Sequence, residues 1–299
     1  MKGFEYVRPS SLEEACAALA GADGSGVADG PVKALAGGTD LLVQMRLGSL
    51  QPRALVSLKD VPGLTYVLLE EDGALAIGAT TPLGVVETSP AVRRSFPAIA
   101  EAAACIGSVQ VRGRATVGGN LCNAAPSADM APILLAFEAE AVITDGRAER
   151  SVRVEDFFVG PGQTALRPGE LLKAIRVPPL PAESYAAYYK TFRSAMDCCT
   201  VGVGIVAVFE SAATILSDLR LALGAVAPTP VRARQAEKMA LDQPLDEGLI
   251  ERLSAKAAAE CWPISDVRAS AEYRTTLVEV LARRGLTDAL SWARKGGRG

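Results

Sequence analysis

The sequence predicts an α+β fold, in which a mixed N-terminal region is followed by a separate C-terminal α+β domain. Two observations support this. Strand-like and helix-like runs are interspersed up to about residue 180, whereas three strand-like runs follow one another after residue 181 and helical runs come only after them. Consecutive strands followed by helices are typical of an α+β unit. Pro178, Pro179 and Pro181 lie between the two regions and indicate a linker.

The N-terminal region divides into two parts. Residues 1–60 predict a helix in SLEEACAALAG, capped by Ser10 or Ser11, then a strand in PVKALAG, a helix in LLVQMRLG and a strand in ALVSL. Residues 61–180 predict two hairpins, because Asp-Gly pairs favour tight turns and occur at residues 72–73 and 145–146. Helices lie between these hairpins, and a strand in ELLKAIRVPP ends this part.

The C-terminal domain, residues 181–290, begins with strand-like runs in SYAAYYKTF, CTVGVGIVAVFE and DLRLALGAVAP. Helical runs follow near residues 232–241, 246–260 and 270–284. The pattern predicts a three-stranded antiparallel sheet with helices. Residues 291–299, which end in RKGGRG, are predicted to be a disordered tail.

Composition excludes several classes of function. The chain has 299 residues, 49% of them hydrophobic, and a net charge of −3, which gives no reason to expect binding to nucleic acid. No apolar run is long enough for a membrane span, and the N-terminus does not resemble a signal peptide. The six cysteines form no CxxC pair and predict reduced thiols in a cytoplasmic protein. Because histidine is absent, we expect no histidine base, no histidine-ligated metal and no catalytic residue of this kind.

The first of two glycine pairs, Gly37-Gly38, lies between a predicted strand and a predicted helix. Glycine lets the backbone approach a ligand closely, and helix starts offer unpaired N–H groups to anions. Thr39 adds a hydroxyl group, and Asp40 can cap the helix. The loop fits a phosphate, although it matches neither GxGxxG nor a triphosphate-binding loop. A tight turn without a ligand explains the pair equally well.

The second pair, Gly118-Gly119, follows a β-like segment and is flanked by Thr116 and Asn120. Asp129 comes shortly afterwards and is suited either to a pair of ribose hydroxyls or to capping the next helix. Each loop alone is ambiguous. Two such loops are better explained by one ligand that carries two phosphates.

These loops, ALAGGTDLLVQMRLG and ATVGGNLCNAAPSADMAPILLA, resemble the signature loops of the FAD-binding medium subunits of molybdenum hydroxylases. The resemblance covers nearly the whole chain, including YYKTFRSAMD and VGVGIVAV. It implies a fold of the vanillyl-alcohol-oxidase-like type, in which two subdomains clamp FAD and a third covers the flavin. Residues that would line the pyrophosphate are Ala36, Gly37, Gly38, Thr39, Asp40, Thr116, Gly118, Gly119, Asn120 and Asn123.

The resemblance further implies that Asp129 holds the adenosine ribose and that Lys190, with Tyr188 nearby, faces the flavin ring. Lys190 could instead be a surface residue of its strand. Tyr188 and Tyr189 point to opposite faces of a strand, so one of them should lie in the core. Cys198 and Cys199 are expected to be a buried pair in a strand, because free cysteines are usually buried. We expect no metal cluster in this chain.

In this family the medium subunit works in a complex of three subunits, which pair as a dimer of heterotrimers. A large subunit holds the molybdenum cofactor, and a small subunit holds two [2Fe–2S] clusters. The medium subunit passes electrons from the clusters through FAD to an external acceptor. The resemblance implies this role here. The alternatives are a self-contained flavin oxidoreductase and a subunit that has lost FAD.

Overall fold

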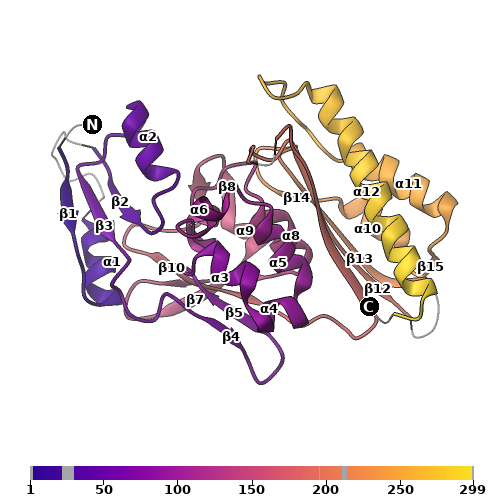
Figure 1. Cartoon of the computed structure of the whole chain (residues 1–299), viewed down its shortest axis with the longest axis horizontal. Helices are drawn as coiled ribbons and strands as arrows, with labels where there is room; N and C mark the ends of the chain where they lie inside the picture. The colour runs from indigo at the N-terminus through magenta and orange to yellow at the C-terminus, as the bar shows by residue number, and fades with distance from the viewer. Residues whose placement is uncertain (1–2, 22–29, 195, 211–213, 298–299) are drawn as a thin grey trace.

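The computed structural model describes residues 3–21, 30–194, 196–210 and 214–297, which form three parts along the long axis of the molecule (Figure 1). The N-terminal part lies at one end, a second part in the middle and the C-terminal domain at the other end. Within the described ranges, no helix is both long enough and apolar enough to cross a bilayer.

The N-terminal part is a small parallel sheet with strand order β1-β3-β2. Its strands are β1 (Glu5–Val7), β2 (Val32–Leu35) and β3 (Ala54–Ser57), and its helices are α1 (Leu12–Ala20) and α2 (Leu41–Leu47). Ser11 caps α1 by accepting from the N–H of Glu14. Gly48 ends α2 in the left-handed conformation that glycine adopts at low cost. Strand β1 was not predicted, because its three residues carry too little pattern.

The middle part contains an antiparallel sheet with strand order β4-β5-β10-β6-β7. Both predicted hairpins are confirmed, as β4–β5 and β6–β7. The strands are β4 (Val67–Leu69), β5 (Leu75–Gly78), β6 (Glu140–Thr144), β7 (Glu149–Arg153) and β10 (Leu171–Val177), with a separate short pair β8 (Phe158–Gly160) and β9 (Gln163–Thr164). The helices are α3 (Leu83–Thr88), α4 (Pro90–Ser95), α5 (Pro97–Ala104), α6 (Val109–Arg112), α7 (Val117–Cys122), α8 (Met130–Ala136) and α9 (Val154–Phe157).

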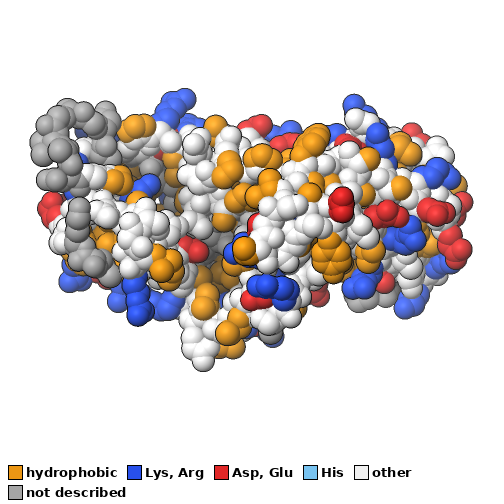
Figure 2. Space-filling model, turned by 90° about the horizontal axis from the view of Figure 1, so that it is seen from above, with side chains coloured by type: hydrophobic (Ala, Val, Ile, Leu, Met, Phe, Trp, Pro, Cys, Tyr) orange, Lys and Arg blue, Asp and Glu red, His pale blue; other side chains and the backbone are white. Residues whose placement is uncertain are grey.

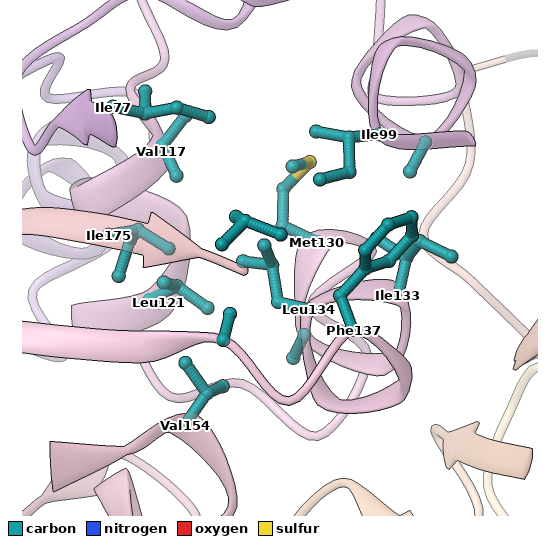
Figure 3. Packing of buried hydrophobic residues seen from close by; sticks show 14 of the residues in the cluster. Ile77, Ile99, Val117, Leu121, Met130, Ile133, Leu134, Phe137, Val154 and Ile175 are labelled. Atoms are coloured by element: carbon teal, nitrogen blue, oxygen red, sulfur yellow. The ribbon is translucent and has the colours of Figure 1, made fainter. Parts of the chain in front are cut away.

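Helix α8 lies at the centre of the largest hydrophobic core (Figure 3). Every residue from Met130 to Ala136 is buried. Figure 3 shows Met130 and Leu134 among side chains from α5, α7 and β10. A helix buried on all sides must pack against neighbours in every direction. Helix α8 therefore also packs, on its remaining side, against a part of the chain outside the middle part.

That remaining side is the C-terminal sheet, with strand order β11-β12-β13-β14 and β15 paired with β13. The strands are β11 (Ser184–Thr191), β12 (Val201–Phe209), β13 (Ile215–Gly224), β14 (Val231–Arg232) and β15 (Gln243–Pro244), and the helices are α10 (Arg234–Ala240), α11 (Glu247–Ala258) and α12 (Ala271–Arg294). Along β12, Val206 and Val208 belong to the core of α8, whereas Ile205 and Ala207 belong to a second core with the C-terminal helices. Both faces of this sheet are thus covered.

The three predicted central strands of this domain are confirmed, but the predicted end of the last helix is wrong. Helix α12 continues to Arg294, so residues 291–294 belong to a helix rather than to a tail, while residues 298–299 lie outside the described ranges. Gly285 lies inside α12, at a point where the helix comes very close to the sheet. A Cβ atom there would overlap Ile205 and lie 2.8 Å from the ring of Tyr189.

Replacing Gly285 with valine is expected to lower the free energy of unfolding by about 1–3 kcal/mol, because the added methyl groups overpack the interface between α12 and β12. The measurement is urea unfolding. Arg284→Val is the control, since Arg284 is exposed in the same helix. Equal midpoints for the two variants would contradict this packing argument.

Candidate functional site

A cavity of roughly 810 Å³ opens between the N-terminal part and the middle part. The surface is hollowed where these parts meet, and hydrophobic side chains gather across the middle of this face (Figure 2). The cavity is lined by the loop after β2, by α7 and by the segment before α8, with residues 196–198 of the C-terminal domain at one end. The predicted residues that line it are Ala36, Gly37, Gly38, Thr39, Asp40, Thr116, Gly118, Gly119, Asn120, Asn123 and Asp129.

The loop after β2 lines this cavity with residues 37–40, whose backbone N–H groups have no hydrogen-bond partner within the described residues. Gly38 has φ = +74°, a left-handed conformation that turns the chain at this point. Successive free N–H groups around such a turn form a concave site for an anion. Asp40 occupies the first position before α2 but makes no side-chain capping bond, and burial raises its pKa.

Gly37 has a different role, because it brings the two loops into contact. A Cβ atom on Gly37 would overlap the backbone carbonyl oxygen of Arg114. In the same way, a Cβ on Gly118 would lie 2.6 Å from the carbonyl oxygen of Ala79. Neither glycine has a positive φ, so the requirement is one of space. These two residues let backbone pack on backbone on each side of the cavity.

The prediction that Gly118-Gly119 lies at the end of a strand is wrong. The pair lies inside helix α7, and only an isolated bridge at Thr116 precedes it. The first N–H groups of α7 are already satisfied: Gly118 donates to the carbonyl of Ala79 at 2.8 Å, and Gly119 donates to Oγ1 of Thr116 at 3.0 Å. Backbone N–H groups of α7 are therefore not available to an anion as those of the first loop are.

What α7 offers instead is side-chain amides. Oδ1 of Asn120 accepts from the N–H of Met130 at 3.3 Å, and Oδ1 of Asn123 accepts from Nε2 of Gln44 at 3.4 Å. Because the amide oxygens accept these bonds, the amide nitrogen of each asparagine remains to donate a hydrogen bond to a ligand. Gln44, on α2, was missed by sequence reasoning because a lone glutamine in an amphipathic helix is indistinguishable from a solvated residue.

Asp129 forms a buried ionic cluster with two residues of β11. Oη of Tyr188 donates to Oδ1 of Asp129 at 2.9 Å, and Nζ of Lys190 lies 3.1 Å from both carboxylate oxygens. Burial raises the pKa of Asp129, while Lys190 and Tyr188 oppose that rise. Tyr188 and Lys190 do not line the cavity; they lie behind Asp129, and Nζ of Lys190 also donates to the carbonyl oxygen of Cys105 at 2.8 Å.

The segment before β12 also contributes residues that the sequence did not mark as site residues. Met196, Asp197 and Cys198 line the end of the cavity next to the C-terminal domain. The expectation of a buried cysteine pair in a strand is wrong, because the pair precedes β12 and Cys198 is exposed, while Cys199 is buried. Both cysteines lie in the irregular segment before β12, so the strand predicted from CTVGVG begins only at Val201.

Comparison with known families gives matches over both halves of the chain. The family described as the FAD binding domain in molybdopterin dehydrogenase matches residues 2–180. The family described as the CO dehydrogenase flavoprotein C-terminal domain matches residues 186–289.

Individual proteins match over nearly the whole chain. A putative xanthine dehydrogenase FAD-binding subunit of Escherichia coli (strain K12) is 36% identical, covering 89% of this chain and 92% of that protein. The carbon monoxide dehydrogenase medium chain of Hydrogenophaga pseudoflava is 33% identical, covering 97% and 98%. A solved carbon monoxide dehydrogenase structure from that organism superposes with a TM-score of 0.90 at 35% identity, covering 98% of both chains. Quinoline 2-oxidoreductase from Pseudomonas putida 86 gives 0.88 at 27% identity, covering 98% and 99%.

Replacing Gly37 with alanine is expected to lower the free energy of unfolding by about 1–3 kcal/mol, because backbone atoms cannot move aside as a side chain can. Gly84→Ala is the matched control: a Cβ there would lie 3.5 Å from its nearest neighbour, an ordinary contact. Chemical denaturation measures both variants. If Gly37→Ala were as stable as the control, the close contact between the two loops would be refuted.

Proposed function

This chain belongs to the family of FAD-binding subunits of the molybdopterin dehydrogenases, and on that premise we propose that the cavity between its first two parts holds FAD. The chain is the FAD-binding subunit of a multi-subunit oxidoreductase of the molybdenum hydroxylase type. The single observation that carries the placement of FAD is the row of free N–H groups at residues 37–40, in a loop that lines a cavity bounded by all three parts of the chain.

The cavity fits the group in size and in chemistry. Its volume of roughly 810 Å³ lies within the range of about 300–1,000 Å³ found for cofactor sites. The N–H groups of Gly37, Gly38, Thr39 and Asp40 suit a pyrophosphate, and the amide nitrogens of Asn120 and Asn123 supply donors from the other side. When bound, FAD supplies the redox chemistry, and the protein supplies binding, orientation and electrostatics.

We propose two ends for the cofactor within the cavity. The end near Asp129 and residues 196–198 belongs to the flavin half, because the C-terminal domain closes it. The contacts of Asp129 with β11 support this placement over the adenosine ribose that the family resemblance implied. The carboxylate of Asp129 forms a charged wall there, with the ammonium of Lys190 behind it, and Thr116 and Gly119 border the middle. The adenosine half then extends past Lys33 toward the N-terminal part.

The proposed partners are a large subunit with the molybdenum cofactor and a small subunit with [2Fe–2S] clusters. Support comes from relatives that are named as medium chains, and thus as parts of larger complexes. We divide this chain into FAD-binding subdomains at 1–60 and 61–180 and a covering domain at 181–290. A cytoplasmic location is in keeping with the six cysteines, which form no disulfide in the structure.

The test of this function measures both cofactor and electron flow. Denaturing the purified chain is expected to release FAD rather than FMN. The bound flavin is expected to be reduced rapidly when a reduced [2Fe–2S] partner is added, and not by aldehydes, purines or aromatic acyl-CoA compounds alone. Stopped-flow absorbance follows the reduction. Rapid reduction of the isolated chain by one of those compounds would favour a self-contained flavin oxidoreductase.

Cys198 provides an independent probe of the site. Iodoacetamide is expected to modify Cys198 in the FAD-free chain and to do so at least several-fold more slowly when FAD is bound, because this exposed thiol lines the proposed flavin end. Cys122 is the internal control, since burial raises the pKa of its thiol to about 12 and leaves almost no thiolate at neutral pH. Peptide mass spectrometry measures both rates. Equal modification of Cys198 with and without FAD would place the flavin elsewhere.

A further inference from the structure

We propose that Tyr188 is a positioning residue for the cofactor site: its buried hydroxyl fixes the carboxylate of Asp129 at the cavity wall, so that strand β11 of the C-terminal domain helps to set flavin affinity. The proposal rests on the proposed function of the cavity. Tyr188 itself does not line the cavity, so it acts through Asp129.

The contacts of Asp129 come from elements on both sides of the domain boundary. Asp129 directly precedes α8, in the middle part, whereas Tyr188 and Lys190 lie two residues apart on β11 and point to the same face of the sheet. Asp129 and Tyr188 are 6% and 8% exposed, and the side chain of Lys190 is 2% exposed. A carboxylate this deeply buried needs its partners, because an unpaired buried charge is costly.

Strand β12 leaves room for the tyrosine hydroxyl. Gly202 pairs with Lys190 across the sheet, and a Cβ atom on Gly202 would lie 2.6 Å from Oη of Tyr188. The thiol of Cys199 lies 3.8 Å from the same oxygen and closes the space behind it. The hydroxyl is thus held between a glycine and a small side chain, with Asp129 as its acceptor.

The charge on Asp129 depends on these neighbours. The titratable groups that face it are Lys190 and Tyr188 on β11, Cys199 before β12, and Cys105 at the end of α5. Burial raises the pKa of Asp129, and the hydrogen bond from Tyr188 opposes that rise. Without the hydroxyl, the pKa of Asp129 rises further. Where FAD binding requires the ionised carboxylate, the variant without the hydroxyl therefore loses FAD affinity at a higher pH, as the pH falls, than the unaltered protein does.

The adjacent residue supplies a matched control. Tyr189 also bonds through its hydroxyl to a carboxylate, Asp288, at 2.6 Å, and to Tyr185 at 2.9 Å. It lies on the opposite face of β11 and packs against the second core, away from the cavity. Tyr188→Phe and Tyr189→Phe therefore remove the same group from neighbouring positions, but only one of them touches Asp129.

The experiment measures FAD dissociation constants for the full-length chain from about pH 5 to pH 8, with thermal unfolding of the FAD-free protein in parallel. Tyr188→Phe is expected to weaken FAD binding roughly 10-fold at neutral pH, as for a lost hydrogen bond to a charged group, and to move the pH at which affinity falls upward. Gly202→Ala, which crowds the hydroxyl, is expected to act in the same direction. Tyr189→Phe should change neither quantity.

Asp129→Asn completes the design, because an amide does not titrate in this range. In that background the pH-dependent part of the effect of Tyr188→Phe is expected to vanish. The proposal is overturned if Tyr188→Phe leaves the pH midpoint unchanged, if Tyr189→Phe weakens FAD equally, or if the shift persists in Asp129→Asn. Failure of the unaltered chain to bind FAD would refute the proposed function instead, so the two failures are distinguishable.

Discussion

The close approach of backbone to backbone at Gly37 and Gly118 is the constraint on which the cavity depends. Gly37 lets the loop after β2 pack against the carbonyl of Arg114, and Gly118 lets α7 pack against Ala79. Protein interiors are packed densely enough that one methyl group at such a point forces a rearrangement. The walls of the cavity are therefore set by main-chain contact. Side chains such as Asn120 and Gln44 then complete a site whose shape the backbone has already determined.

Helix α8 connects the walls of the cavity to the C-terminal domain. One face of this fully buried helix packs within the middle core, and the other packs on β12 so closely that a Cβ on Gly204 would lie 2.7 Å from the carbonyl of Pro132. Asp129, which precedes the helix, meets Tyr188 and Lys190 at this contact. The same few residues thus hold Asp129 at the cavity wall and join the C-terminal domain to the middle part. Cofactor binding is therefore linked to the packing of these two parts.

Much of the fold could be predicted from local pattern, and the site only in part. Asp-Gly hairpins and the fully apolar β12 have signals within a few residues, so they were predicted correctly. The length of α12 was not, because Gly285 reads as a helix end unless its packing against Ile205 is known. The free N–H groups of the first loop agree with what its glycine pair predicts. In α7, by contrast, the N–H of Gly119 is capped by Thr116 and the N–H of Gly118 makes a tertiary hydrogen bond to Ala79. Gln44 and Tyr188 acquire their roles only through residues distant in sequence.

The C-terminal sheet, covered on both faces, has a consequence for biosynthesis. One face of β12 is completed by helices that are translated after it, but the other is completed by α8, which leaves the ribosome first. The face with Val206 and Val208 thus meets its partner surface as soon as the strand emerges, and only the opposite face waits for the later helices. Had the gene order of the two regions been reversed, Val206 and Val208 would face solvent until the second half was made, a state prone to aggregation.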